Sequence, residues 1–171
     1  MAAQKFLALV AGRIKELTAS VVSAGSADDG KLVALDAAGK LDASVLPAGI
    51  GVNTVAAVAS ETLSANDLVN LWNDTGTLKA RKADATTEGK ECHGFVKAGV
   101  SASATATIYT PGNLITGLSG LTPGARQYLA TTAGARTETP PSATGNVLQM
   151  VGIAADATSL VFEPEEPITR A

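Results

Sequence analysis

Apolar side chains recur near the N-terminus at alternating intervals of three and four residues: Leu7, Val10, Ile14, Leu17 and Val21. This spacing is the a/d pattern of a heptad repeat, and it predicts an amphipathic helix over residues 3–24. An isolated helix of about three heptads is marginal in water, and Gly12 weakens it further. We therefore expect the helix to form only when it packs on its own domain, in a three-stranded bundle of copies, or on a partner surface.

A near-repeat follows over residues 28–47. Asp28-Asp29-Gly30 and Asp36-Ala37-Ala38-Gly39 each place turn-forming residues ahead of a Lys-Leu pair. The apolar residues of this segment are separated by small or polar ones, and they are too few to form a core of their own: Leu32, Leu35, Leu41, Val45 and Leu46. The pattern predicts an extended connector that rests its leucines on another surface. Pro47 ends it, and residues 48–51 read as a linker or the entry to a strand.

The rest of the chain alternates short apolar runs with turn residues, which is typical of β-strands. Asn73–Gly76 predicts a hairpin turn and Thr122-Pro123-Gly124 a tight turn, whereas residues 61–66 and 84–88 read as loops. Regularly spaced short strands predict a compact antiparallel β-barrel or β-sandwich over residues 51–171. The predicted strands span residues 52–58, 68–72, 78–82, 93–100, 104–109, 114–118, 125–131, 136–137, 147–154 and 160–163.

Composition indicates that this core is thin. Hydrophobic residues make up 46% of the 171 residues, but aromatic residues make up only 4%. Small side chains bury little area each, so a chain of this kind gains stability by burying surface against identical copies. The residues that we expect to be covered by self-association are Leu7, Val10, Ile14, Leu17, Val21, Leu32, Leu35, Leu41 and Leu46.

Charge and cysteine content exclude several classes of protein. The net charge is −3 with both signs mixed along the chain, which argues against a nucleic-acid partner. No stretch approaches the roughly 20 apolar residues that a membrane span requires. The single Cys92 forms neither an intramolecular disulfide nor a metal site alone, and it suits a chain made in a reducing cytosol.

Candidate catalytic groups are sparse. His93 is the only histidine and adjoins Cys92, but neighbouring residues of a strand point to opposite faces, so the two side chains do not form a nucleophile pair. The acidic pairs and triplets, Asp28-Asp29 and Glu163 with Glu165 and Glu166, lack the spacing of a calcium loop. We expect no enzymatic activity, no metal and no cofactor. Trp72 is expected to anchor the core or a subunit interface.

Two stretches of the sequence resemble known proteins. "DDGKLVALDAAGKLDASVLP" resembles the connector that joins a trimeric stalk or anchor to a globular knob in bacteriophage head-fibre, capsid-decoration and tail-fibre proteins. "GLSGLTPGARQYLATTAGARTETPP" and "GNVLQMVGIAADATSLVFEP" resemble a recurrent small β-domain of phage structural proteins. The resemblance implies a homotrimer in which three copies of the connector bury their leucines against one another.

Together these patterns predict a mainly β protein with an N-terminal helix or arm (residues 1–27), an extended connector (28–50) and a β-rich domain (51–171). The resemblance implies a capsid decoration (cement) or head-fibre protein, made in the bacterial cytoplasm and located on the virion. Its partners would be its own copies and the major capsid protein, with no nucleic acid, membrane or small-molecule substrate. The residues expected to contact an acidic capsid surface are Lys31, Lys40, Lys79, Arg81 and Lys82.

A second interpretation is a tail-fibre or receptor-binding protein that contacts the host surface. Tail fibres are usually longer, and receptor-binding knobs often expose aromatic residues. The short length and low aromatic content of this chain disfavour that interpretation.

Overall fold

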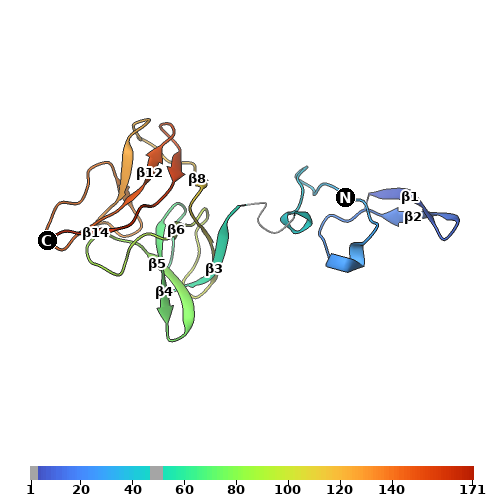
Figure 1. The fold of residues 1–171 in the computed structure, drawn as a ribbon, viewed down its shortest axis with the longest axis horizontal. Coiled ribbons are helices and arrows are strands. Elements are labelled where there is room, and N and C mark those ends of the chain that lie inside the picture. The colour runs from blue at the N-terminus through green and yellow to red at the C-terminus, as the bar shows by residue number, and fades with distance from the viewer. Residues whose placement is uncertain (1–3, 47–51) are drawn as a thin grey trace. The chain divides into compact units, whose positions relative to one another are not determined.

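The computed structural model describes residues 4–46 and 52–171, and the chain divides into two compact units (Figure 1). We refer to Met1–Gly51 as the N-terminal unit and to Val52–Ala171 as the C-terminal unit. Strands are the main regular secondary structure of both units, and the only helical elements in the described residues are two short 3-10 turns. The predicted mainly β fold is confirmed, whereas the predicted N-terminal helix is wrong.

The N-terminal segment forms a β-hairpin in place of the helix. Strand β1 (Lys5–Val10) pairs antiparallel with β2 (Arg13–Thr18). The two-residue turn between them has positive φ at both positions, 52° at Ala11 and 76° at Gly12, which is the geometry whose twist matches that of the flanking strands. Gly12, which disfavours a helix, adopts this conformation at no steric cost. The heptad spacing therefore did not determine the secondary structure.

The connector is folded into turns and is not extended as predicted. A 3-10 turn, η1, spans Gly25–Asp28, and a second, η2, spans Ala43–Val45. Ser20 and Val33 form an isolated parallel bridge that draws the connector back beside the end of β2. Pro47 and the linker predicted over residues 48–51 lie outside the described residues.

Five strands of the C-terminal unit close into a barrel. They are β3 (Thr54–Ala59), β4 (Leu68–Asp74), β5 (Thr77–Lys82), β6 (Gly94–Phe95) and β7 (Thr105–Tyr109), in the order β3-β5-β4-β6-β7. All neighbours are antiparallel except β3 and β5, which are parallel. A closed ring with an odd number of strands cannot alternate direction at every step, so one parallel pair is obligatory. The prediction of a wholly antiparallel domain is therefore wrong at this pair.

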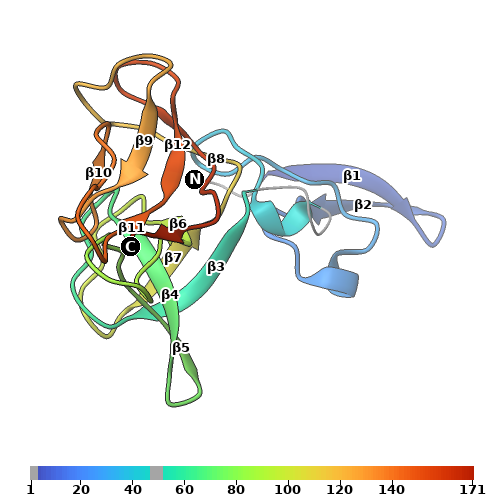
Figure 2. The ribbon, with the colours of Figure 1, turned by 60° about the vertical axis from the view of Figure 1, so that its left-hand side comes forward.

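The predicted hairpin turn at Asn73–Gly76 is confirmed. It joins β4 to β5 through Thr75 and Gly76, whose φ angles are 50° and 89°. Both views of the structure show this hairpin projecting beyond the rest of the C-terminal unit (Figures 1 and 2). The smaller of two core clusters comes mainly from the barrel strands and contains aliphatic side chains, half of them alanine: Ala57, Ala59, Leu63, Val69, Ala80, Val96, Ala106 and Ile108.

An open sheet of five strands completes the C-terminal unit (Figure 2). Its strands are β8 (Asn113–Ile115), β9 (Arg126–Leu129), β10 (Arg136–Thr137), β12 (Met150–Ala154) and β13 (Leu160–Phe162), in the order β10-β9-β12-β13-β8. A separate pair joins β11 (Val147–Leu148) to β14 (Ile168–Thr169). The domain is thus a barrel combined with a sheet, which neither predicted alternative described alone.

Several predicted strands differ in extent from the observed ones. The run over residues 93–100 contributes only Gly94–Phe95, and the run over 147–154 is divided between β11 and β12. Gln149 lies at the division and is buried: its Oε1 accepts from Cys92 N at 2.7 Å, and its Nε2 donates to Cys92 O at 3.1 Å. The pairing of that side chain with the Cys92 backbone coincides with the break between β11 and β12. The backbone O of Gln149 still accepts from Leu129 N of β9 at 2.9 Å. Strand β14 was not predicted.

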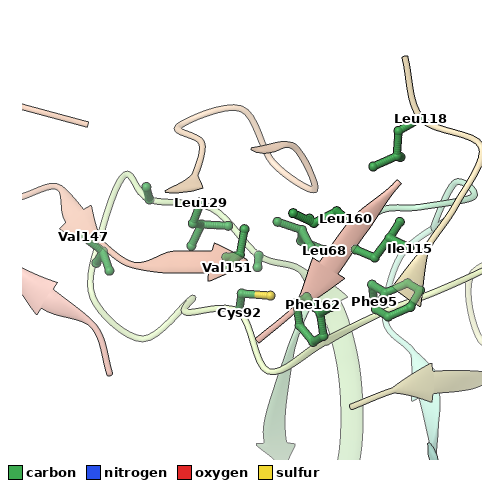
Figure 3. Packing of buried hydrophobic residues seen from close by; sticks show 12 residues of the cluster. Leu68, Cys92, Phe95, Ile115, Leu118, Leu129, Val147, Val151, Leu160 and Phe162 are labelled. Atoms are coloured by element: carbon green, nitrogen blue, oxygen red, sulfur yellow. The ribbon is translucent and has the colours of Figure 1, made fainter. Parts of the chain in front are cut away.

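The larger core lies between the sheet and the barrel (Figure 3). Phe95, on the barrel strand β6, is fully buried in this core, and its ring centroid lies 5.4 Å from that of Tyr109 and 5.2 Å from that of Phe162. Its buried members are Leu68, Ala83, Ala85, Cys92, Phe95, Ile115, Leu118, Leu129, Val147, Val151, Leu160 and Phe162. This core contains aromatic rings, which the cluster of the barrel strands lacks.

Candidate self-association and docking surfaces

The N-terminal unit has almost no apolar core of its own. Among the side chains that the structure describes in residues 4–46, Ala34 is the only buried hydrophobic one. Seven of the nine residues predicted to self-associate are exposed, and the other two, Leu17 and Leu46, are half-buried. The seven exposed residues are Leu7, Val10, Ile14, Val21, Leu32, Leu35 and Leu41.

The hairpin register divides the predicted helical seam between two faces. Leu9 lies opposite Ile14, and Leu7 lies opposite Glu16, which places Leu7, Leu9 and Ile14 on one face. These three side chains are 72%, 74% and 75% exposed, and we call them the hairpin face. Val10 and Leu17 lie on the opposite face. Leu9 is not among the residues predicted to self-associate, because it does not occupy an a or d position of the heptad pattern. The alternation of Leu7 and Leu9 is, however, typical of a strand.

The turns of the connector are held by hydrogen bonds, because few apolar side chains are buried there. The Asp28 carboxylate accepts from Lys31 Nζ at 2.8 Å, from the Ala24 backbone N at 2.6 Å and from Ser20 Oγ at 3.0 Å. These donors, Lys31 foremost, lower the pKa of Asp28 from its ordinary value of 3.8 to about 2. The first turn of the near-repeat is therefore built around one ionised carboxylate.

The second turn of the near-repeat is also held by an aspartate carboxylate. Asp36 Oδ1 accepts from the backbone N atoms of Ala38 at 2.8 Å and Lys40 at 2.9 Å. Gly30 and Gly39, which precede the two lysines, have nearly equal φ values of 74° and 73°. The predicted turns ahead of the two Lys-Leu pairs are confirmed. Asp36 caps backbone N–H groups within its own turn, whereas the backbone donor to Asp28 is Ala24, which precedes the turn.

Protonation of Asp28 is expected to open the first turn. Because the fold favours the carboxylate, its contribution to the stability of the N-terminal unit is fully present above pH 3.8 and is lost as the pH falls to about 2. A ¹³C NMR titration of the side-chain carboxyl of Asp28 should give a midpoint near 2. Lys31→Met removes the largest cause and should move the midpoint toward 3.8, and a wild-type midpoint already at 3.8 would contradict the assignment.

Most of the basic residues predicted to contact a capsid already have partners in the molecule. Lys31 pairs with Asp28 at 2.8 Å, Lys82 pairs with Asp67 at 3.3 Å, and Lys79 pairs with Asp74. An acidic partner surface would have to compete with these carboxylates. Lys40, which is exposed, has no ion-pair partner among the described residues.

Arg81 is also held by its own domain. It donates to Asn70 Oδ1 at 2.9 Å and to Gly89 O at 2.6 Å, and its guanidinium lies 4.9 Å from the centre of the Trp72 ring. Trp72 is half-buried on β4, its ring lies against the Arg81 guanidinium, and it does not belong to the central core.

The Cys92–His93 pair is not arranged for nucleophilic catalysis. Cys92 is buried, and burial raises the pKa of its thiol to about 12, which disfavours the thiolate. His93 is exposed, and its Nδ1 accepts a hydrogen bond from the Leu71 backbone N at 3.0 Å. The ring therefore bonds to strand β4 and not to the thiol.

Residues 4–46 and 52–171 contain neither a metal-binding cluster nor a membrane-spanning helix. No group of three or more His, Cys, Asp or Glu side chains is arranged to hold a metal ion. No helix there is long and apolar enough to cross a membrane.

Comparison with known proteins gives a structural likeness and no sequence match. No known protein family matches this chain, and no curated protein matches it. Among solved structures, the chain is similar to the N base of the head fibre gp8.5 of bacteriophage phi29, with 14% identity over 66% of this chain and 95% of that one, and a TM-score of 0.43. At that identity and TM-score, the likeness assigns this chain neither a family nor a role.

Proposed function

We propose that this chain is a structural protein of a bacteriophage virion that assembles as a homotrimer on the outer surface of the capsid. In this role, as a decoration or head-fibre protein, it stabilises the junctions between capsomers. The observation that carries the proposal is the N-terminal unit, in which most leucine, isoleucine and valine side chains are exposed and only Ala34 is buried among the described side chains. The near-repeat and the β-domain sequences, which resemble phage appendage proteins, supply the class of particle.

Burial against neighbouring copies is the physical basis of the assembly. An isolated two-stranded hairpin is marginally stable in water, so the β1–β2 hairpin needs further cover. Full burial of a large apolar side chain contributes about 1.5–3 kcal/mol. Three such side chains on the hairpin face of each copy give a trimer a substantial driving force, and the same contacts stabilise the hairpin itself.

Attachment to the capsid would gain from the threefold assembly. Three copies present three identical docking surfaces at once, so modest contacts per copy sum to tight binding through effective concentration. Among the basic residues, we expect Lys40 to make the main contact with the capsid, because the other four already form ion pairs or hydrogen bonds within the chain. The role is one of binding without turnover, and it uses no cofactor, metal, nucleic acid or membrane.

The oligomeric state is the first test. Analytical ultracentrifugation of the full chain at micromolar concentration should give the mass of a trimer. The double variant Leu9→Lys/Ile14→Glu replaces a facing apolar pair with a facing ion pair, which preserves hairpin pairing but removes the apolar surface. It should raise the concentration at which the trimer dissociates at least tenfold.

Leu78→Lys is the matched control, because Leu78 is also exposed, at 45%, but lies on β5 of the C-terminal unit. It should leave the mass unchanged. A wild-type monomer at micromolar concentration would overturn the homotrimer. A trimer that the double variant does not weaken would show that the hairpin face is not where the copies meet.

Location on the particle is the second test. Electron microscopy of virions assembled with gold-labelled protein should show label distributed over the head. Label confined to the tail would overturn the capsid role in favour of a tail-fibre or receptor-binding protein, for which this chain is short and poor in aromatic residues.

A further inference from the structure

The open sheet of the C-terminal unit has an apolar outer face. Leu114 on β8 lies opposite Val161 on β13, and Val161 lies opposite Ile153 on β12. Directly opposed residues share a face, so the three form a continuous row across neighbouring strands. They are 43%, 41% and 44% exposed, whereas their chain neighbours Ile115, Leu160 and Phe162 are fully buried. The row therefore points away from the core.

The row continues into a wider apolar surface. Met150 on β12 lies opposite Tyr128 on β9, and both side chains are half-buried. Beside Met150, Ile153 and Val161 the surface is hollowed, with a volume of about 430 Å³, and Pro164 lines the same hollow. We call Leu114, Tyr128, Met150, Ile153 and Val161 the outer sheet face.

This arrangement is unusual for a sheet with one side on the core. Antiparallel sheets normally alternate, with apolar residues facing inward and polar residues facing solvent. Here the outward positions of three adjacent strands hold leucine, valine and isoleucine. Contiguous exposed apolar patches of this kind mark interaction surfaces in soluble proteins.

Charges of opposite sign flank the outer sheet face. Arg126 on β9 lies opposite Ile153 and extends the row on one side, whereas Glu163 and Glu165 line the hollow. None of these three has an ion-pair partner among the described residues. A surface that carries an unpaired cation on one side and unpaired carboxylates on another is complementary to a second copy of itself.

We propose that the outer sheet face is a self-association surface, distinct from the hairpin face, on which a second copy of this chain packs with its own outer sheet face. The inference rests on the proposed homotrimer: three faces turned toward a common axis bury their rows together. In each contact, Arg126 of one copy meets Glu163 of the next. The C-terminal units thereby hold the trimer together in addition to the N-terminal units.

The first experiment is a substitution at the centre of the row. Val161→Lys places a charge there, and sedimentation equilibrium of the full chain should show the trimer dissociating at a concentration at least tenfold higher than for wild type. Leu78→Lys, equally exposed but remote from the row in the strand order, should match wild type. Far-UV circular dichroism and the unfolding midpoint should show that Val161→Lys remains folded.

The second experiment exchanges the flanking charges, which lie at exposed positions and leave the core intact. Arg126→Glu and Glu163→Arg should each raise the dissociation concentration about fivefold, because each places like charges in contact. The double variant Arg126→Glu/Glu163→Arg restores the pairing and should return within twofold of wild type. An additive loss in the double variant would overturn the pairing.

The outcomes separate this inference from the proposed function. A monomeric wild type overturns both. A trimeric wild type whose mass and dissociation are unaffected by Val161→Lys and by both charge reversals overturns this inference alone. If Val161→Lys leaves the trimer intact but abolishes co-sedimentation with phage heads, the outer sheet face binds capsid protein instead, and self-association through it is overturned.

Discussion

Phe95→Ala is expected to lower the free energy of unfolding of the C-terminal unit by about 3–5 kcal/mol. Phe95 is fully buried on β6, a barrel strand, and its ring contacts Tyr109 of the barrel and Phe162 of the sheet. Truncation removes two aromatic contacts and leaves a cavity where the two layers meet. Because the chain has few aromatic residues, no other ring is available to fill that space.

Urea unfolding followed by circular dichroism measures this loss. Phe95→Leu keeps most of the buried volume and should cost less than half as much. Leu78→Ala, at an exposed position, should stay within about 0.5 kcal/mol of wild type. A loss below about 1 kcal/mol for Phe95→Ala would show that the barrel and the sheet do not depend on this ring.

Gly152→Ala is expected to destabilise the same unit by about 3–5 kcal/mol through a different mechanism. A Cβ at position 152 would lie 2.0 Å from the carbonyl O of Val161 and 3.2 Å from Leu160 Cδ1. The obstructing oxygen belongs to the backbone of β13, which is hydrogen-bonded to β12 along the sheet. The methyl group can be accommodated only if β12 and β13 move apart and the hydrogen bonds between them break.

Gly124→Ala is the matched control for this substitution. Gly124 also has a positive φ, 80° compared with 152° at Gly152, but a Cβ there would meet nothing within 4 Å. It should therefore show only the cost of backbone strain, about 1–2 kcal/mol. Equal losses for the two variants in urea unfolding would contradict the steric argument. The outer sheet face should also be disturbed in Gly152→Ala, because Ile153 and Val161 flank the obstructed contact.

Local chemistry made much of the fold predictable. Four predicted turns form, and each contains a glycine at positive φ: Asp28–Lys31, Asp36–Lys40, Asn73–Gly76 and Thr122–Gly124. In the first three, an aspartate or asparagine side chain accepts a hydrogen bond from a nearby backbone N–H group. In the last, Ala125 N donates to Thr122 O at 2.9 Å. Turn preferences are properties of a few adjacent residues, so they can be read without knowledge of the rest of the chain.

The N-terminal segment shows where such reasoning fails. Leu7, Val10, Ile14 and Leu17 fit a helical seam, but the unbroken apolar run from Phe6 to Val10 fits a strand equally well. The turn at Ala11-Gly12 and the pairing of β1 with β2 decide between them. As a result, the residues predicted to form one seam lie on two faces of the hairpin. Leu9, which the heptad pattern left out, lies on the exposed hairpin face.

The amino-acid sequence by itself determined that this protein is mainly β, where its turns lie, and that its apolar residues are small and sparse. These properties follow from backbone preferences, from period-two alternation and from composition. Only the tertiary structure decided that five strands close into a barrel with one parallel pair. It also decided that Phe95 packs between the barrel and the sheet, and that Leu114, Val161 and Ile153 point outward. The reason is that strand order and facing depend on contacts between residues far apart in the chain, which no local pattern encodes.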